Sequence, residues 1–293
     1  MLPPELVAQI RLLEIRTDRV VEEITGGAYR SIFKGRGIEF EEVREYTLED
    51  DVRLIDWNVS ARMGTAYIKK FVEERELNVM FLVDVSASGS FGSTSQSKRR
   101  TAAELAALLA FSAGKNGDRT GLMMFSDRIE LFLPPRSGRR HALRMISEML
   151  TFEPEHKGTD IAMVLSECAR MLKKRTIVFL ISDLIDTGDF SDELKLLNRR
   201  HDVIALKISD PVEKRWPENM PPVELEDAES GEVVSFDRPP AALSAELAAL
   251  QLKCEDICRQ AQVDLVNVEN GGDVLKPLIS FFSRRRYRRG RRP

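Results

Sequence analysis

The segment "NVMFLVDVSASGS" runs from Asn78 to Ser90 and joins an apolar run to a series of polar side chains. Apolar residues without polar alternation indicate a strand that is covered on both faces, as in a parallel sheet. The run stops at Asp84, and Ser86 and Ser88 follow at alternate positions. Because alternate residues of an extended chain project to the same side, the segment predicts a buried strand that ends in one carboxylate and two hydroxyls.

The chain on either side of this segment predicts the fold class. A second fully apolar strand is expected in "TIVFLISDL", further strands at 202–209 and 263–268, and a hairpin around Ser126-Asp127. Helices are expected between the strands, at 97–117, 138–152, 159–175, 190–201 and 241–260. Strands that alternate with helices predict an α/β fold, with a doubly wound, mainly parallel sheet and helices on both faces.

The sequence divides into three parts. Residues 1–76 are expected to hold an N-terminal helix at about 4–23 and then a charged, partly β arm. Residues 77–270 form the α/β domain, with a hairpin insertion at about 223–237, and residues 271–293 form a C-terminal helix and an arginine-rich tail. We expect paired charges to pin the arm to the α/β domain rather than to bind a ligand, and Trp57 to be a packing anchor.

Charge and cysteine content bear on the compartment and on the partners. The 293 residues have a net charge of −3, although seven arginines lie between Arg284 and Arg292. Such a run is expected to be solvated and disordered; it could also attract acidic protein, nucleic acid or anionic lipid, but specific nucleic-acid recognition is not expected. Three scattered cysteines indicate a reducing compartment, and Cys254 and Cys258 are expected to be core residues rather than zinc ligands.

The apolar runs are too short for a transmembrane helix. Spanning a bilayer takes about 20 apolar residues, and no run in the sequence approaches that length. The N-terminal stretch is amphipathic and charged, unlike a signal peptide. We therefore expect a cytoplasmic protein that reaches a membrane only through a partner.

Three segments carry polar residues that could meet at one place. Asp84 and Asp183 each end a buried strand, and Thr159 lies just before a helix. In doubly wound sheets, ligands bind beyond the carboxyl ends of the strands. Together with Ser86 and Ser88 these residues offer only oxygen ligands, which suit Mg²⁺ and would also accept Mn²⁺.

Each of these residues also has a purely structural interpretation. A polar residue after a strand is often a helix N-cap, and for Thr159 alone capping is the favoured role. Asp84 differs, because the next helix is expected to start near Ser97, about ten residues later. For Asp183 alone the two interpretations are balanced. The combination of all three segments favours a metal site.

The motifs "DVSAS", "GTD" and "SD" resemble the metal-ion-dependent adhesion site of von Willebrand factor type A domains. The resemblance extends from about Leu77 to Ile208. It implies that Mg²⁺ is coordinated by Asp84, Ser86, Ser88, Thr159 and Asp183. In that family the site usually serves protein–protein adhesion rather than catalysis.

The upstream stretch "SIFKGRGIEFEEVREYTLEDDVRLIDWNVSAR" is similar to the signature of a bacterial family of unknown function. Members carry this arm before a type A domain, and their genes commonly lie beside MoxR-type AAA+ ATPases. The resemblance implies a role in assembling or activating protein complexes with the ATPase. The sequence departs from the pattern at Glu49, where glycine is expected before Asp50-Asp51.

Our leading hypothesis is a metal-dependent protein–protein interaction module. The metal would accept a carboxylate from an acidic residue of a partner, an AAA+ ATPase or its client. We expect no enzyme, because no general base is evident beside the site and GxSxG, HExxH and phosphate-loop motifs are missing; His156 is taken as a loop residue. Two alternatives remain: a Mg²⁺-dependent hydrolase of the phosphoesterase kind, and a structural scaffold with an inactive metal site.

Overall fold

The structure is a computed structural model that describes residues 39–47, 50–72, 76–94, 96–186, 188–214, 223–226, 233–236 and 241–290. The chain forms two compact units, one of residues Phe33–Leu77 and one that contains Asn78–Pro293. We call them the small unit and the sheet unit. The expected helix at 4–23 and Glu49 lie outside the described residues.

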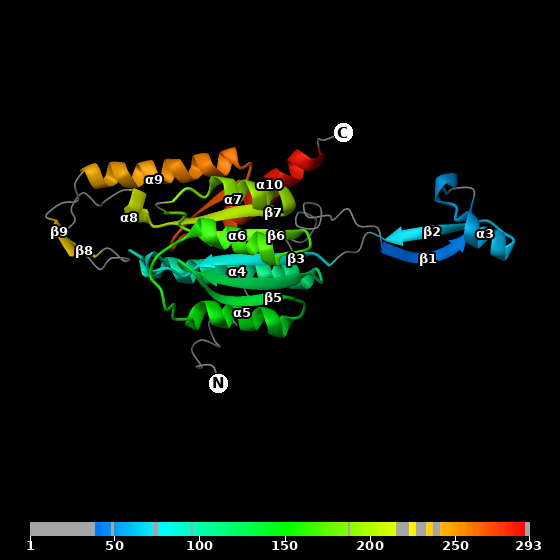
Figure 1. Ribbon diagram of the computed structural model, residues 1–293, viewed down its shortest axis with the longest axis horizontal. Coiled ribbons are helices and arrows are strands. Elements are labelled where there is room, and N and C mark those ends of the chain that lie inside the picture. The colour runs from blue at the N-terminus through cyan, green and yellow to red at the C-terminus, as the bar shows by residue number, and fades with distance from the viewer. Residues whose placement is uncertain are drawn as a thin grey trace. The chain divides into compact units, whose positions relative to one another are not determined.

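The sheet unit is built on one six-stranded sheet (Figure 1). Its strand order is β10-β7-β6-β3-β4-β5, and all neighbouring strands are parallel except β4 and β5. The strands are β3 (Asn78–Asp84), β4 (Arg119–Phe125), β5 (Ile129–Arg136), β6 (Thr176–Ser182), β7 (Asp202–Ser209) and β10 (Asp264–Glu269). The predicted doubly wound, mainly parallel α/β fold is confirmed.

Helices lie on both faces of this sheet. They are α4 (Lys98–Lys115), α5 (Arg139–Thr151), α6 (Ile161–Met171), α7 (Ser191–Arg200), the short α8 (Pro211–Lys214), α9 (Ala241–Gln260) and α10 (Leu275–Gly290). The predicted boundaries of α4 agree with the structure, since Ser97 caps its start and Gly117 follows its end with a φ of 79°. None of the described helices is long and apolar enough to cross a membrane.

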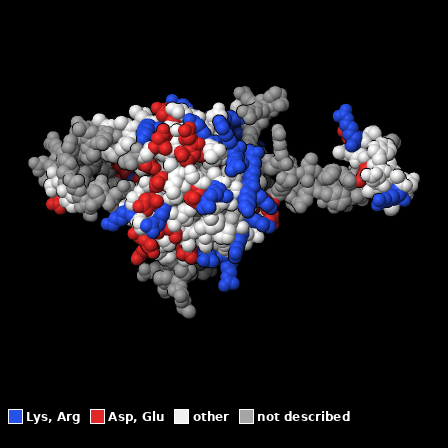
Figure 2. Space-filling model, viewed as in Figure 1, with Lys and Arg blue, Asp and Glu red and all other residues white. Residues whose placement is uncertain are grey.

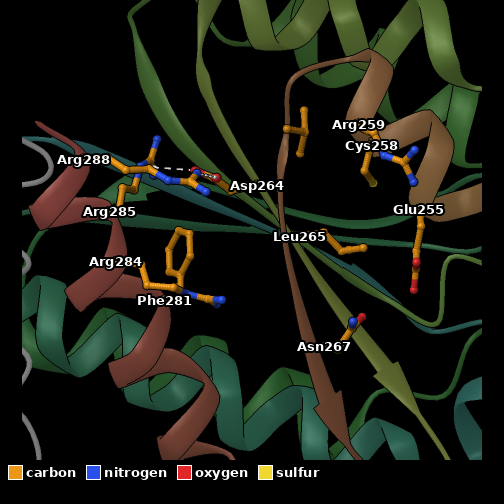
Figure 3. A pocket seen from close by; sticks show the side chains of 11 residues that line it. Glu255, Cys258, Arg259, Asp264, Leu265, Asn267, Phe281, Arg284, Arg285 and Arg288 are labelled. Carbon is orange, nitrogen blue, oxygen red and sulfur yellow. Dashed lines mark ion pairs between the residues drawn. The ribbon is translucent and has the colours of Figure 1, made fainter. Parts of the chain in front are cut away.

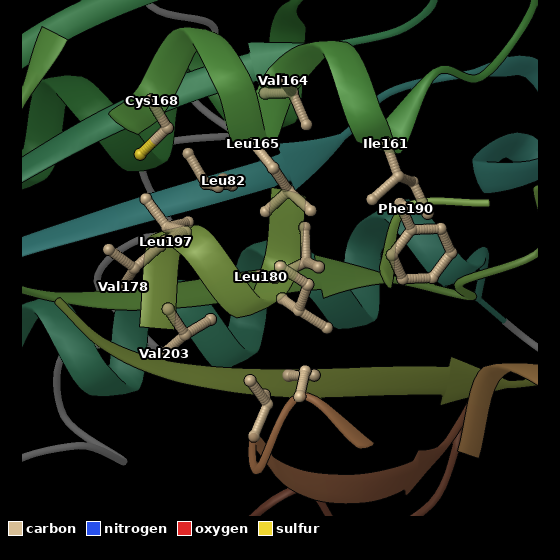
Figure 4. Close-up of a cluster of buried hydrophobic side chains, with 14 of the residues drawn as sticks. Leu82, Ile161, Val164, Leu165, Cys168, Val178, Leu180, Phe190, Leu197 and Val203 are labelled. Atoms are coloured by element: carbon tan, nitrogen blue, oxygen red, sulfur yellow. The ribbon is translucent and has the colours of Figure 1, made fainter. Parts of the chain in front are cut away.

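The core explains why β3 and β6 are apolar at every position between their first and last residues. Leu82 and Leu180 belong to a buried cluster with side chains of α6, α7 and α9 on one face of the sheet (Figure 4). Phe81 points to the opposite face, because successive strand residues alternate, and its ring stacks on that of Phe179 with centroids 5.6 Å apart. Both faces of the central strands are therefore buried, and no alternation of polar residues is possible.

The expected hairpin insertion is present as β8 (Val223–Glu226) paired antiparallel with β9 (Val233–Phe236). The residues between the two strands, 227–232, lie outside the described residues.

The arginine-rich end corrects a prediction. It was expected to be disordered, but α10 continues through the arginines as far as Gly290, and only 291–293 lie outside the described residues. The guanidinium of Arg285 forms ion pairs with Asp202 and, at 3.3 Å, with Asp264. These carboxylates stand at the starts of β7 and β10 and fix the arginine run to the sheet.

The small unit has a fold of its own. It contains β1 (Glu39–Glu45) paired antiparallel with β2 (Tyr67–Val72), the 3₁₀ turn η1 (Val52–Leu54) and α3 (Trp57–Met63). Arg44 binds Asp50 through two hydrogen bonds of 2.9 and 2.6 Å, so this charge pair lies within the unit. That paired charges pin the arm to the sheet unit stays a prediction. Trp57 opens a helix without buried residues and is 69% exposed, so it does not anchor packing within the small unit, and its expected role as an anchor on the sheet unit stays a prediction.

Gly121 of β4 gives a test of the packing around the sheet. A Cβ atom there would lie 2.9 Å from Leu133 O, Pro135 N and Met80 Cε. We expect Gly121→Ala to lower the free energy of unfolding by about 1–3 kcal/mol through overpacking. Gly114→Ala is the control, since nothing lies within 4 Å of its Cβ and alanine favours the helix by about 1 kcal/mol. Urea denaturation that ranks the two variants in the opposite order would contradict this packing.

Candidate metal centre

Asp84 and Asp183 meet at the point where the strand order reverses. From β3 the chain continues through β4 and β5 toward one edge, and from β6 through β7 and β10 toward the other. Asp84 ends β3 and Asp183 directly follows β6, which is the neighbouring strand, with Val83 opposite Ile181. Such a switch point at the carboxyl ends of the strands is where doubly wound sheets bind ligands.

The Asp84 carboxylate is buried and held by two hydrogen bonds. Its Oδ1 accepts from the Ser86 backbone N–H at 2.9 Å, and its Oδ2 accepts from the Ser182 hydroxyl at 2.6 Å. Burial and the negative charge of Asp183 raise the pKa of Asp84 from 3.8 to about 6, although the bonds from Ser182 and Ser86 act to lower it. Two carboxylates that repel each other in a buried place would be stabilised by a cation between them.

The hydroxyls of Ser86 and Ser88 lie close together, although the chain does not stay extended as the alternate spacing assumed, because Ser88 lies in a 3₁₀ turn. Ser86 precedes the 3₁₀ turn η2 (Ala87–Ser90), and its side chain makes no capping hydrogen bond there. Its hydroxyl instead lies 3.1 Å from that of Ser88. The pair of hydroxyls therefore sits beside the Asp84 carboxylate, as a metal site of this kind requires.

A backbone hydrogen bond brings the loop of Thr159 to the serines. The Ala87 N–H donates to the carbonyl of Lys157 at 3.0 Å, two residues before Thr159. The capping interpretation of Thr159 is wrong: α6 is capped by Asp160, whose Oδ1 accepts from the Met163 N–H at 2.8 Å. The Thr159 hydroxyl is thus not needed to cap the helix.

Asp183 is held by an unusual turn. Leu184, the next residue, has a φ of 59°, and its N–H donates to the Ser182 hydroxyl at 2.9 Å. The N–H of Ile185 donates to Asp183 Oδ1 at 3.1 Å. A leucine in the left-handed region costs energy, and such residues cluster at functional sites.

A buried lysine that is not among the predicted site residues lies at this site. Lys98 is the first residue of α4 and is 4% exposed, and its Nζ donates to Asp183 Oδ2 at 3.0 Å. The same ammonium forms an ion pair with Glu213 of α8. Burial acts to lower the pKa of Lys98, but the two carboxylates outweigh it and raise the pKa. Asp183 therefore already has one positive neighbour.

His156 contacts Asp127 and Glu130 rather than the residues of the candidate metal centre. Its Nδ1 lies 2.9 Å from Asp127 Oδ1, and its backbone N–H donates to Glu130 Oε1 at 3.2 Å. The hydrogen bond from His156 contributes most to lowering the pKa of Asp127. This histidine fixes the loop of Thr159 to the β4–β5 hairpin, so it does not face Asp84 as a base would.

The donor set fits a hard divalent cation. The converging side chains are two carboxylates and hydroxyls, and Mg²⁺ is bound through such oxygens together with waters. Among the described residues, no group of three or more His, Cys, Asp or Glu could hold a metal ion, so a site here must also use hydroxyls. A cavity of about 350 Å³ lies elsewhere, between α9, β10 and α10 (Figure 3).

Comparison with known proteins agrees with the fold. A solved BatB structure from Bacteroides thetaiotaomicron is 16% identical, covers 71% of this chain and 98% of that chain, and has a TM-score of 0.51. An aerotolerance-related membrane protein from Bacteroides fragilis is 17% identical, covers 72% of this chain and 99% of that chain, and has a TM-score of 0.50. At such identities the likeness concerns the fold alone, which agrees with the α/β architecture of the sheet unit.

Sequence relatives extend over nearly the whole chain. The uncharacterized proteins Mb1516 of Mycobacterium bovis and Rv1480 of Mycobacterium tuberculosis are each 29% identical over 288 residues, which is 97% of this chain and 90% of the relative. Residues 42–255 match the family described as "Protein of unknown function DUF58". This match covers the greater part of the chain, and the protein therefore belongs to the DUF58 family.

Proposed function

We propose that the protein is a metal-dependent protein–protein interaction module. Asp84, Ser86, Ser88, Thr159 and Asp183 would hold Mg²⁺, with Mn²⁺ as a substitute. The buried pair of Asp84 and Asp183 carries the proposal: burial and then the charge of Asp183 raise the pKa of Asp84, and Lys98 neutralises only Asp183, so a cation beside Asp84 would be stabilising. The hydroxyls of Ser86 and Ser88, 3.1 Å apart, supply neutral ligands beside them.

The partner group we propose is a carboxylate. A shell with few carboxylates leaves the cation short of negative charge, so that it can accept an acidic side chain from another protein. The protein would contribute the fixed ligands and the orientation, and the partner would complete the shell. The resemblance of the upstream stretch to proteins whose genes lie beside MoxR-type AAA+ ATPases leads us to propose such an ATPase, or its client, as the partner, in the assembly or activation of protein complexes.

We further propose that this takes place in the cytoplasm. All three cysteines are buried and unbridged, which suits a reducing compartment.

Metal binding tests the proposal directly. We expect calorimetry to detect Mg²⁺ and Mn²⁺ binding, and Ser88→Ala combined with Thr159→Ala to weaken it by about ten-fold or more. Ser90→Ala is the matched control, because Ser90 lies in the same turn but outside the proposed ligand set. Absence of metal binding by the unaltered protein would favour a scaffold with an inactive site.

Partner binding is the second arm of the same test. We expect the protein to retain a MoxR-type AAA+ ATPase in Mg²⁺ and to release it in EDTA. The Ser88→Ala and Thr159→Ala double variant should not retain the ATPase in either condition. Retention that is unaffected by EDTA would contradict a metal bridge. Metal-dependent release of phosphate from simple phosphoesters would favour the hydrolase alternative instead.

A further inference from the structure

The end of the sheet opposite the candidate metal centre is strongly basic. Parallel strands begin at this end, and three runs of cations lie there: residues 173–175 before β6, 199–200 before β7 and 284–288 near the end of α10. We call these three runs the basic edge. Figure 2 shows a band of Lys and Arg side chains that crosses the visible face of the sheet unit.

Strand pairing and an ion pair make the three runs neighbours. Ile177 of β6 pairs with Asp202 of β7, which places the residues just before these strands side by side. Arg285 of α10 binds Asp202, which brings the third run to the same place. The pKa of the buried His201 is lowered by its burial and then by the positive charges of Arg200 and Arg175. These two arginines belong to two of the three runs.

Most of these charges are not neutralised by the protein. Residues 173–175 and 199–200 are exposed, and none of their side chains forms an ion pair with any residue that the structure describes. In α10, Arg285 and, at 3.7 Å from Asp264, Arg288 form ion pairs with carboxylates of the sheet, whereas Arg284 and Arg286 are exposed. The cavity of about 350 Å³ opens beside this run and is lined in part by Arg284, Arg285 and Arg288 (Figure 3).

We infer that the basic edge docks the protein onto the surface of an anionic lipid bilayer. The cations come from three separate elements and spread along one end of the sheet, which suits an extended plane of negative charge. Each Lys or Arg held near such a surface contributes about a five-fold gain in affinity at low salt. Tyr287, which is 62% exposed within the arginine run, has the amphipathic ring that prefers the headgroup level.

The same observations disfavour nucleic acid as the occupant. Single strands are bound by successive aromatic side chains on which the bases stack. Within the basic edge Tyr287 is the one exposed aromatic residue among those described. Duplexes are read by a helix or strand that enters a groove, whereas most of these cations lie at strand starts and helix ends.

Docking of this kind would orient the molecule. β3 runs from Asn78 near the basic edge to Asp84 in the candidate metal centre, about 20 Å away at the rise of an extended strand. A protein held by its basic edge therefore presents Asp84, Asp183 and the serine hydroxyls away from the lipid, where a partner can reach them. The inference does not depend on the metal, because the two places lie at opposite ends of the sheet.

Vesicle flotation with the full chain tests the inference. We expect the protein to float with vesicles of phosphatidylcholine and phosphatidylglycerol in equal parts, not with phosphatidylcholine alone, and to detach as the salt concentration rises. The triple variant Lys173→Gln, Lys174→Gln and Arg175→Gln should bind at least about ten-fold more weakly.

A matched triple variant controls for total charge. Arg128→Gln, Lys195→Gln and Lys253→Gln remove three cations around the other end of the sheet, since Arg128 lies in the β4–β5 turn and Lys253 donates to the Gly188 carbonyl. This variant should float like the unaltered protein, and EDTA should have no effect. Equal losses in both triple variants, or tighter binding to RNA, duplex DNA or polyglutamate than to the vesicles at the same salt, would overturn the inference.

Discussion

Replacing Lys98 with methionine should lower the free energy of unfolding by about 3–5 kcal/mol when no divalent cation is present. The ammonium is 4% exposed and is bound to Asp183 at 3.0 Å and to Glu213. Methionine fills much of the same volume but removes the charge, so the buried carboxylate of Asp183 and the partly buried one of Glu213 stay without it. Breaking a buried ion pair from one side is costly for this reason.

A divalent cation should restore part of that loss. If Mg²⁺ binds beside Asp183, it supplies positive charge where the ammonium has been removed. We therefore expect Mg²⁺ to stabilise the Lys98→Met variant more than it stabilises the unaltered protein, in urea denaturation with and without the metal. If Mg²⁺ stabilised both proteins equally, the charge of Lys98 would have no bearing on the metal site.

Lys207 provides the matched control. It is also 4% exposed, but it has no ion pair with a residue that the structure describes. Lys207→Met should therefore change the free energy of unfolding much less. A loss in Lys207→Met as large as in Lys98→Met would mean that burial of the stem, rather than the charge pair, explains the effect.

The fold could be predicted because the sheet is parallel and covered on both faces. β3 and β6 are buried along their length, so their sequences lack polar alternation, and the helices between them have clear limits such as Ser97 and Gly117. Once the strands are parallel, their carboxyl ends share one edge. That rule alone brings Asp84 and Asp183 together.

The charges around the site could not be predicted in the same way. Lys98 and Glu213 are distant in the sequence, and each looks like a solvated surface residue there. The one local signal is that a lysine at the first position of a helix opposes the helix dipole. Such a conflict with local preference points to a tertiary role, here the ion pairs with Asp183 and Glu213.

The arginine run of α10 was predicted wrongly for a related reason. Its composition is that of a disordered tail, and composition gives no sign of the two carboxylates that order it. Asp202 and Asp264 begin separate strands, and they come close to Arg285 only when β7 and β10 pair. A long-range pairing therefore overrides a local tendency.

Asp84→Asn should change stability and metal binding in opposite senses. At neutral pH and without metal, we expect the free energy of unfolding to rise by about 1–3 kcal/mol. Mg²⁺ affinity should fall by about 100-fold or more, because even residues that only support metal ligands cost about 10- to 100-fold when they are changed. Calorimetry and urea denaturation measure the two quantities on the same protein.

The sign of the stability change follows from the raised pKa of Asp84. The folded protein holds this carboxyl with a pKa of about 6, against 3.8 for an ordinary aspartate, so between these values the folded state binds more protons than the unfolded state. The unaltered apoprotein should thus gain stability from this group as the pH falls through about 6. Asparagine resembles the protonated form, and the difference between the two proteins should vanish at acid pH.

Asp210 is the control of opposite sign. It is fully buried at the end of β7, and although burial acts to raise its pKa, hydrogen bonds from Ser93 and Asn270 lower it. Asp210→Asn should therefore destabilise the protein and leave Mg²⁺ binding in place. A loss of stability in Asp84→Asn like that in Asp210→Asn would mean that Asp84 serves the fold. If Asp84→Asn instead raises stability and weakens Mg²⁺ binding, the fold tolerates the unfavourable Asp84 carboxylate because it is needed as a metal ligand.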